Sequence, residues 1–454
     1  MTGSEFDLVV IGAGSGGVRA ARVAAELGAR VAVIESGKFG GTCVNLGCVP
    51  KKLLVHGAEF ARELADSRGF GWSTAAPSFD WPTLIARKDA EIARLNAVYQ
   101  RLLESAGVEI VRGHARLATA RSVQVGSRTL ACEHVLLATG SAPALPVLPG
   151  SEHAITSDQA FHLPALPRRV TIVGGGYVAV EFAGIFHGFG ARVAIVNRGD
   201  QLLMAFDREL GQHLARELTK QGIAIHCPTT ALAIERRDGE LHTELSDGTV
   251  LASDLVLLAT GRRPSTGELG LPQVGVRLAA DGAVLVDAYS RSSVPNVFAV
   301  GDCAGGPGLT PVAIADGQAA AHTMFGSAPV PTVDRDKIPT ALFSQPPVAT
   351  VGLSEEEARA RGLDVVIYRS VFTPLKHRLS GRDAKTLMKL VVERSSDRVL
   401  GCHMVGESAP EIMQGFAVAV QCNATKAALD ATLGIHPTAA EEWVTMRSPV
   451  VPRA

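Results

Sequence analysis

Two cysteines, Cys43 and Cys48, lie five positions apart in the segment GGTCVNLGCVPKK. Neighbours on an ideal helix are three or four residues apart, and a disulfide needs Cα atoms about 4.4–6.8 Å apart. The two sulfurs can therefore pair only where the helix is distorted, and Gly47 lets the chain bend just before Cys48. Pro50 suits a first helical turn. The spacing predicts a strained, reducible cysteine pair at a loop-to-helix junction; the alternative is two small buried apolar residues.

A glycine turn near the start of the chain is typical of dinucleotide binding. It follows the predicted strand Asp7–Ile11, precedes a helix pattern, and fits G-x-G-x-x-G. Such a turn brings a pyrophosphate to the N-terminus of a helix, where free N–H groups and the helix dipole favour anions. Glu35 ends the next strand, Val31–Ile34, and its carboxylate suits a ribose diol. The turn residues that we expect to bind the cofactor are Gly12, Gly14, Ser15, Gly16 and Gly17.

A second turn of this kind, G-x-G-x-x-A, follows the predicted strand Val170–Val173 and contains Gly174 and Gly176. The strand after it ends in Asn197 and Arg198, so a neutral amide replaces the acid of the first turn. An acid there would repel a 2′-phosphate, whereas an arginine accommodates it. The second turn is therefore predicted to bind NADPH and the first to bind FAD. The alternative for Arg198 is a solvated charge at a strand end.

The cysteine segment resembles the active-site segment of the flavoprotein disulfide reductases, the class I pyridine nucleotide-disulfide oxidoreductases. Its CVPKK portion and later segments resemble the glutathione reductases among them, and the resemblance runs from Asp7 to Pro449. It implies that Cys48 is the flavin-proximal thiolate and that Cys43 is the interchange thiol that attacks the substrate. It also implies that Lys51 lies near the flavin.

The resemblance implies further roles at both cofactor sites. Tyr177 would cover the flavin and move aside for nicotinamide, and Glu181 would pair with Lys51. Asp302, otherwise a turn acid, would lie near the flavin ribityl–phosphate region, and the helix that begins at Thr310 would face the flavin ring with its N-terminus. The other cofactor contacts that the resemblance implies are Thr42, Ala115, Thr139, Val178 and Gly261.

Near the C-terminus, the segment GIHPTAAEE resembles the catalytic motif of the family's interface domain. The resemblance implies that His436 is the acid and base for the thiols and that Glu441 orients its imidazole. In the family this histidine belongs to the neighbouring subunit, so a homodimer is implied. A histidine before a proline is otherwise more often structural.

The resemblance implies that glutathione disulfide is the substrate. Ser15, Arg22 and Tyr99 match contacts of the family, and the anionic peptide calls for local positive charge. Arg22 and the neighbouring Arg19 argue against a cationic substrate such as that of the trypanothione reductases. This chain departs from the family at two positions, with Met204 where a second NADPH arginine is common and Gln318 where some members have an arginine.

These residues need an α/β fold with two Rossmann-like dinucleotide-binding domains and a C-terminal α+β interface domain. A chain of 454 residues suits about three domains. We assign 1–148 to FAD binding, 149–272 to NADPH binding, 273–336 to a central segment and 337–454 to the interface domain. The expected helices are Leu53–Ala65, Trp81–Gly107, one starting at Thr310, Ala409–Val420 and Lys426–Thr432.

Composition excludes several other classes. The formal net charge of −1 implies no polyanion-binding surface, and the chain has no apolar run long enough to span a membrane. Seven cysteines argue against a secreted disulfide framework, so a cytoplasmic protein is expected. The cysteines other than Cys43 and Cys48 are expected to be structural.

Alternative functions remain open at this point. One is an NADPH-linked reductase of another low-molecular-weight disulfide, and a second is a flavoprotein scaffold without turnover, which would have no need of the cysteine–histidine set. Asn197 and Arg198 disfavour a lipoamide dehydrogenase. The mercuric reductases and large thioredoxin reductases are disfavoured because the sequence has no cysteine in its tail.

Overall fold

The computed structural model describes residues 5–73 and 78–451. The chain divides into two compact units, each assembled from three separate segments. The first unit comprises Met1–Leu53, Thr83–Ala144 and Gly261–Val333, and the second comprises Leu54–Pro82, Leu145–Thr260 and Asp334–Ala454. Helices α3 (Cys48–Ser67) and α4 (Trp81–Ser105) contribute residues to both units. The domain boundaries given above stay predictions.

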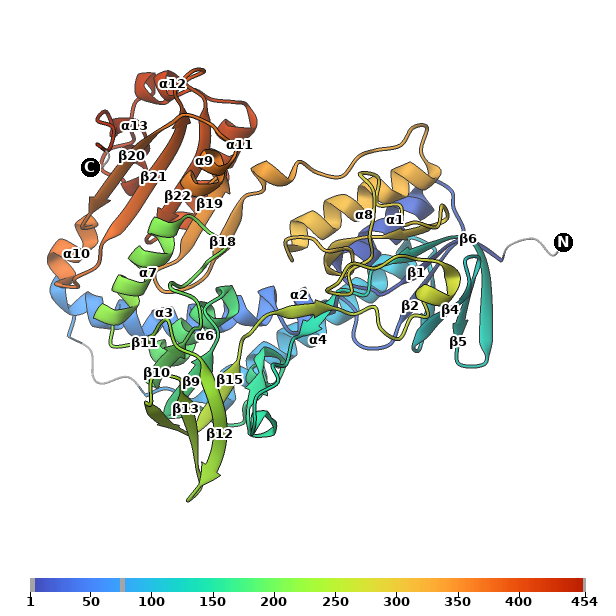
Figure 1. Cartoon of the computed structure of the whole chain (residues 1–454), viewed down its shortest axis with the longest axis horizontal. Helices are drawn as coiled ribbons and strands as arrows, with labels where there is room; N and C mark the ends of the chain where they lie inside the picture. Colours follow the sequence, from blue (N-terminus) through green and yellow to red (C-terminus); the bar gives the residue numbers. More distant parts are fainter. Residues whose placement is uncertain (1–4, 74–77, 452–454) are drawn as a thin grey trace. The chain divides into compact units, whose positions relative to one another are not determined.

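The first unit is organised around a sheet with the order β3-β2-β1-β6-β5-β4, in which β17 also pairs with β6 (Figure 1). Strands β3, β2, β1, β6 and β17 are parallel, so their carboxyl ends meet at one edge, where ligands bind in folds of this type. The apolar strands β1 and β2 are buried almost throughout. The strands are β1 (Phe6–Ile11), β2 (Val31–Glu35), β3 (Glu109–Arg112), β4 (Ala115–Thr119), β5 (Ser122–Val125), β6 (Arg128–Leu137) and β17 (Val297–Ala299), with a small separate pair, β7 (Ser141–Pro143) and β16 (Arg262–Pro264).

Helices α1 (Ser15–Glu26) and α8 (Thr310–Phe325) lie side by side in this unit (Figure 1). Two glycines allow this close approach. A Cβ on Gly16 would lie 3.0 Å from the carbonyl oxygen of Ala313, and one on Gly317 would lie 2.5 Å from the carbonyl oxygen of Gly16. Packing at this distance fixes where the N-terminus of α8 lies relative to the first glycine turn.

The second unit contains a parallel sheet with the order β11-β10-β9-β15-β8 and a separate antiparallel sheet of β12, β13 and β14. Helix α6 (Tyr177–Gly188) follows β9 directly, which repeats the strand–turn–helix arrangement of β1 and α1. The strands are β8 (Ile155–Thr156), β9 (Arg169–Val173), β10 (Arg192–Val196), β11 (Ala224–His226), β12 (Ala231–Arg237), β13 (Glu240–Leu245), β14 (Val250–Ser253) and β15 (Leu255–Leu258); the helices are α5 (Ser157–Ala160) and α7 (Arg208–Lys220).

The C-terminal part of the second unit is an antiparallel sheet with the order β18-β19-β22-β21-β20. Helix α11 (Ala409–Gln421) packs on it, and Trp443 is fully buried in the same core. The strands are β18 (Thr340–Leu342), β19 (Val348–Gly352), β20 (Val365–Phe372), β21 (Thr386–Glu393) and β22 (Val399–Val405); the other helices are α9 (Glu355–Ala360), α10 (Leu375–Ser380), α12 (Lys426–Ala431) and α13 (Glu442–Thr445).

The α/β fold class with a C-terminal α+β region is confirmed. The helix expected over Leu53–Ala65 is confirmed and is longer than expected, because it runs from Cys48 to Ser67 and includes the turn at Pro50. The apolar pattern of its later turns is visible in the sequence, whereas its first turns contain Pro50 and the adjacent lysines Lys51 and Lys52. No helix in the described ranges is long and apolar enough to cross a membrane.

Candidate active site

The cysteine pair lies across a break between two helices. Cys43 belongs to the short helix α2 (Gly41–Asn45), and Cys48 is the first residue of α3. Leu46 and Gly47 separate the helices, and the N–H of Lys51 donates to the Gly47 carbonyl at 3.0 Å, which starts the new helical ladder. The predicted distortion between the cysteines is confirmed, and both thiols are free.

Asn45 holds this break in place, and sequence reasoning did not single it out. Its Nδ2 donates to the carbonyls of Phe39 at 3.0 Å and Gly41 at 2.9 Å, and its Oδ1 accepts from Nδ2 of Asn96 on α4 at 2.9 Å. These bonds fix the short helix that carries Cys43. The available signal was an amide in an otherwise apolar run between the two cysteines.

The cysteine segment packs directly on the first glycine turn. The N–H of Gly40 donates to the Ala13 carbonyl at 2.8 Å, and a Cβ on Gly41 would lie 2.7 Å from the Cα of Gly14. Gly12 has a φ of +106°, and a Cβ there would lie 2.4 Å from the carbonyl oxygen of Ala138. The turn therefore requires glycine for its own conformation and for the approach of the dithiol segment.

Cys48 is held in an environment that favours its thiolate. Its pKa is lowered to about 6 by a hydrogen bond from Cys43, by a further one from Thr310 and by the charge of Lys51. Sγ of Cys48 lies 3.6 Å from Oγ1 of Thr310, the first residue of α8, so the sulfur is next to the positive end of that helix. The pKa of Cys43 is raised, first by its hydrogen bond to Cys48 and then by burial.

The first strand-end acid, Glu35, organises the backbone around the turn. Its Oε2 accepts from the Ala13 N–H and its Oε1 from the Gly37 N–H, both at 2.7 Å. A carboxylate has about four acceptor positions, so Glu35 retains capacity for a ribose hydroxyl. The N-terminus of α1, which has no side-chain cap, and the glycines before it fit a dinucleotide pyrophosphate.

Other predicted cofactor residues gather in the first unit. Asp302 Oδ2 accepts from Ser141 Oγ at 2.6 Å, and Arg262 donates to the same hydroxyl at 2.9 Å. This small network links the segment after β17 to the β7–β16 pair. The remaining predicted residues have these places: Thr42 is on α2 beside Cys43, Ala115 starts β4, Thr139 follows β6, and Gly261 precedes β16.

Among the predicted substrate contacts, Tyr99 lies close to the dithiol. The pKa of its hydroxyl is raised by burial and by the proximity of Cys43 and Cys48. Ser15 begins α1, and Arg22 lies two turns further along the same helix, with Nη2 at 3.9 Å from Glu26. This long ion pair on a partly exposed helix face leaves the guanidinium available to a ligand.

The second turn differs from the first in its strand-end residue. A Cβ on Gly174 would lie 2.2 Å from the Ala259 carbonyl oxygen, as at Gly12. The buried Asn197, however, is a donor: its Nδ2 donates to the carbonyls of Gln201 at 2.8 Å and Gly199 at 3.4 Å. The Cys227 thiol also donates to the Gly199 carbonyl, at 2.7 Å.

These bonds shape the turn that carries the predicted 2′-phosphate residue. Arg198 is exposed, whereas the nearby Arg208 is tied to Asp200 at 2.8 Å. Met204 is exposed and its side chain lies beside Gly199. At the position where a second arginine is common, the turn therefore presents an apolar side chain.

Helix α6 carries three more predicted residues. Tyr177 is exposed at its first position, Val178 follows, and Glu181 is buried. Oε1 of Glu181 accepts from the N–H of Phe343 at 2.8 Å. Lys51 belongs to the first unit and Glu181 to the second, and their pairing stays a prediction.

His436 and Glu441 meet in the C-terminal segment. Nδ1 of His436 lies 3.2 Å and 3.1 Å from the two carboxylate oxygens of Glu441. A Cβ on Gly434 would lie 2.8 Å from Cβ of Glu441, so the motif's glycine allows this approach. The imidazole side chain is 81% exposed, so Nε2, its other ring nitrogen, is available for proton transfer.

Comparisons with known proteins agree with this arrangement. The family model for pyridine nucleotide-disulphide oxidoreductases matches residues 6–317, and the model for their dimerisation domain matches residues 338–447. The chain therefore belongs to the pyridine nucleotide-disulphide oxidoreductases, a class defined by the dinucleotide folds and the reducible cysteine pair.

Full-length relatives narrow this class further. The chain is 52% identical to a glutathione reductase of Burkholderia cepacia over 98% of this chain and 99% of the relative. It is 45% identical to the chloroplastic/mitochondrial glutathione reductase of Pisum sativum, over 98% and 83% respectively. It is also 42% identical to a trypanothione reductase of Trypanosoma congolense, over 98% and 96%. The resemblance to glutathione reductases is confirmed.

Proposed function

We propose that this protein is an NADPH-dependent glutathione-disulfide reductase that works through a Cys43–Cys48 disulfide and keeps a thiol pool reduced. One observation carries the mechanism: the dithiol lies against a dinucleotide turn, and the N-terminus of α8 lies beside Cys48. The choice of substrate is supported by the relatives, two of which are glutathione reductases at 52% and 45% identity.

The glycine turns and strand ends fit two dinucleotides. FAD, when bound, supplies a group that accepts two electrons from a nicotinamide and can pass them to a sulfur. Gly12, Gly14 and Glu35 would hold it at the first turn. Asn197 and Arg198 would hold the NADPH adenosine end at the second, where Arg198 pairs with the 2′-phosphate.

The chain's own residues then carry out thiol–disulfide exchange. Two electrons and a proton convert the Cys43–Cys48 disulfide into one thiol and one thiolate, and Thr310 and Lys51 stabilise the charge on Cys48. The Cys43 thiolate attacks one sulfur of glutathione disulfide, which breaks its S–S bond and releases one glutathione. Cys48 then attacks Cys43 in the mixed disulfide, and the second glutathione leaves as the original disulfide re-forms.

His436 would act as the acid and base in these steps. It takes the proton of Cys43 and gives it to the first leaving glutathione thiolate, and it is held for this by Glu441. We propose that the histidine acts on the dithiol of the neighbouring subunit, so that a homodimer forms two complete sites. A dimerisation-domain match over residues 338–447 supports the dimer.

Ser15, Arg22 and Tyr99 would bind the peptide. Tyr99 adjoins the dithiol, and Arg22, with Arg19 on the same helix, supplies positive charge for glutathione carboxylates. The cationic substrate named in trypanothione reductase would be repelled by these arginines. We also propose that the protein works in the cytoplasm, because seven cysteines, an odd number, argue against a secreted disulfide framework.

Subunit complementation tests the shared site. The variants Cys43→Ser and His436→Ala should each be inactive alone. If the histidine acts on the neighbouring subunit, each mixed dimer has one site with both intact residues, and random mixing restores roughly a quarter of wild-type activity. No recovery in confirmed mixed dimers, or an active wild-type monomer, would refute the shared site. Recovery with glutathione disulfide but not with trypanothione disulfide would support the substrate.

A further inference from the structure

A cavity of about 250 Å³ lies within the second unit, away from the groups used above. Its walls come from α3, the end of α7, the segment 374–386 and the loop after β22. The volume is below that of typical sites for drug-sized ligands, so only a small ligand fits. Its charged and ionisable lining residues are Arg62, Lys220, His377, Arg382, Asp383, Lys385 and Glu407.

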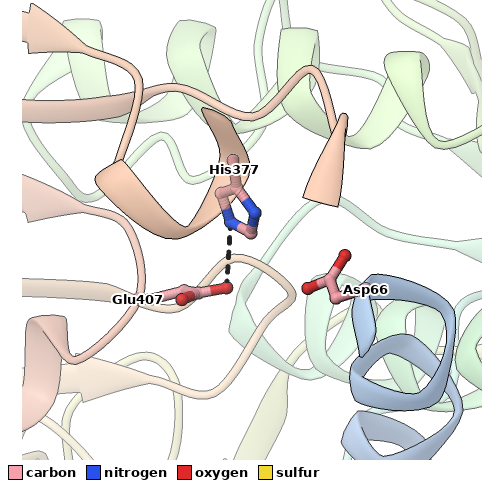
Figure 2. A group of neighbouring side chains, drawn as sticks. All are labelled: Asp66, His377 and Glu407. Atoms are coloured by element: carbon pink, nitrogen blue, oxygen red, sulfur yellow. Dashed lines mark hydrogen bonds and ion pairs between the residues drawn. The ribbon is translucent and has the colours of Figure 1, made fainter. Parts of the chain in front are cut away.

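Two lining residues, His377 and Glu407, form with the neighbouring Asp66 a group that resembles a metal site. Figure 2 shows His377 bonded to Glu407, with Asp66 pointing toward them from α3, and their donor atoms lie within 4.8 Å of one another. Both carboxylates are already held by cations. Arg382 donates to both oxygens of Asp66, with Nε–Oδ1 at 3.0 Å, and Nζ of Lys376 lies 3.5 Å from Asp66 and 3.8 Å from Glu407.

A divalent cation would therefore face two positive side chains and compete for carboxylates that they occupy. The other lining acid, Asp383, is likewise paired, with Lys220 at 3.4 Å. The acidic groups at the cavity are therefore already paired with cations. Some of the cations, in contrast, form no ion pair with any residue that the structure describes.

Arg62 is such a cation. Its pKa is lowered to about 10, because burial removes the guanidinium from water and because Arg382 is nearby; the carboxylates of Glu407, Asp66 and Glu59 act more weakly in the opposite direction. Its Nη1 donates to Oε1 of Gln345 at 3.2 Å, and across the described residues no carboxylate oxygen lies within 4.0 Å of it. A guanidinium has five N–H donors, so most of its donor capacity is unused by this bond.

The side chains of Gln345 and Lys385 also have N–H donors without a full set of acceptors among the described residues. Gln345 is 2% exposed, and its Nε2 has no hydrogen-bond partner within residues 5–73 and 78–451. Lys385, which lines the cavity, donates from Nζ to the Thr373 hydroxyl at 2.5 Å, and the described part of the chain gives it no ion pair. Arg62 and Lys385 thus line one small cavity, and neither forms a direct ion pair with a carboxylate of the described residues.

We propose that this cavity binds a small oxyanion of the phosphate type, held by Arg62 and Lys385. Such an anion supplies acceptors for N–H groups that have none, and it would form direct ion pairs with two cations that have no carboxylate within 4.0 Å in the described residues. A phosphate can come from free inorganic phosphate or from the phosphate monoester of a nucleotide. The site is separate from the Arg198 turn, which is also expected to attract phosphate.

The test uses the FAD-loaded full-length protein carrying Arg198→Met, so that the 2′-phosphate site does not contribute. Inorganic phosphate is titrated and followed by calorimetry and by ³¹P NMR line broadening. Adding Arg62→Met or Lys385→Met should each weaken binding roughly tenfold, because each removes one charge-assisted contact. Arg68→Met, which removes an exposed arginine near the end of the same helix, should leave binding unchanged.

Flavin content and circular dichroism confirm that each variant is folded, and two independent variants guard against a local defect in one. If AMP also binds and Arg62→Met weakens its binding as much as that of phosphate, the site is assigned to nucleotide phosphates. If inorganic phosphate binds and AMP does not, it is assigned to the free ion. The proposal is overturned if phosphate does not bind the Arg198→Met protein, or if neither Arg62→Met nor Lys385→Met changes the affinity for phosphate. Binding of Mn²⁺ that is lost in His377→Ala would overturn it in favour of a metal.

Discussion

The two glycine turns of this protein share a backbone and differ in the polarity of one side chain. Gly12 and Gly174 both have a positive φ, and a Cβ on either would collide with the carbonyl oxygen of the residue just after the neighbouring parallel strand, β6 or β15. At the strand end, Glu35 accepts hydrogen bonds from backbone N–H groups, whereas Asn197 donates to backbone carbonyls. The backbone of both turns fits a dinucleotide, and in our proposal the residue at the strand end sets which ribose each turn accepts.

A second difference concerns the neighbours of the turns. The first turn contacts the dithiol segment through Gly14 and Gly41, and the second is followed by the strand-end turn that carries Arg198. The dithiol therefore lies against the turn that has the acid, and Arg198, the residue proposed to bind the 2′-phosphate, follows the turn that has the amide. The same fold serves two roles because of what is packed against it.

Substituting the first glycine of each turn gives the largest expected effect. Gly12→Val should yield protein without flavin, because the side chain collides with the Ala138 carbonyl in a strained backbone conformation. Gly174→Val should yield yellow protein whose flavin is no longer reduced by NADPH. Flavin absorbance and anaerobic reduction measure both. The comparison fails if the two variants show the same defect.

Changing the strand-end residues of the second turn should alter cofactor choice. Arg198→Met should raise KM for NADPH by roughly ten- to a hundredfold, the loss of a charge-assisted contact, and leave KM for NADH nearly unchanged. Asn197→Asp should act in the same direction, since a carboxylate repels the 2′-phosphate and cannot donate to the carbonyls of Gly199 and Gln201. Arg208→Met, which removes an arginine already paired with Asp200, is the matched control. An equal rise for both nucleotides would contradict this assignment.

The dithiol beside the first turn should show a pH dependence set by Cys48. With a pKa of about 6, its thiolate is present above that pH and is protonated, hence lost, below it. Thr310→Val and Lys51→Met each remove a group that lowers this pKa, so each should move it upward by about one unit. Ultraviolet thiolate absorbance of the reduced protein follows the titration. A downward move, or none in either variant, would show that these groups do not stabilise the thiolate.

Cys227→Ala should give the smallest effect. It removes one thiol donor to Gly199 and leaves the two bonds from Asn197, so KM for NADPH should rise about two- to threefold while flavin content is unaffected. Cys132→Ala, a change of a buried cysteine in the first unit, should leave KM for NADPH unchanged. An increase as large as that of Arg198→Met would mean that Cys227, and not Asn197, shapes the turn.

Much of this arrangement could be predicted from local sequence. Strands β1, β2, β9 and β10, both glycine turns and the helix at Thr310 follow from short patterns whose cause is local. The bend between the cysteines followed from their spacing and from Gly47. The pairing of His436 with Glu441 was implied by resemblance, and the structure places the two groups at 3.1 Å.

Interactions between distant segments could not be predicted. Asn45 matters through Asn96, and the lowered pKa of Cys48 depends on Thr310, 262 residues later in the chain. The sequence showed only that Asn197 replaces the acid of the first turn. That its side chain donates hydrogen bonds depends on how the following turn folds. The lack of a direct ion pair for Arg62 within the described residues is equally invisible in sequence, because it depends on which carboxylates the other cations occupy.

The most direct test of the central claim is steady-state oxidation of NADPH by the purified protein with glutathione disulfide. We expect rapid turnover that requires the disulfide, is far slower with NADH, and disappears in Cys43→Ser although NADPH still reduces the flavin. Turnover that survives in Cys43→Ser, or a wild-type protein that reduces its flavin with NADPH but does not consume glutathione disulfide, would contradict the account.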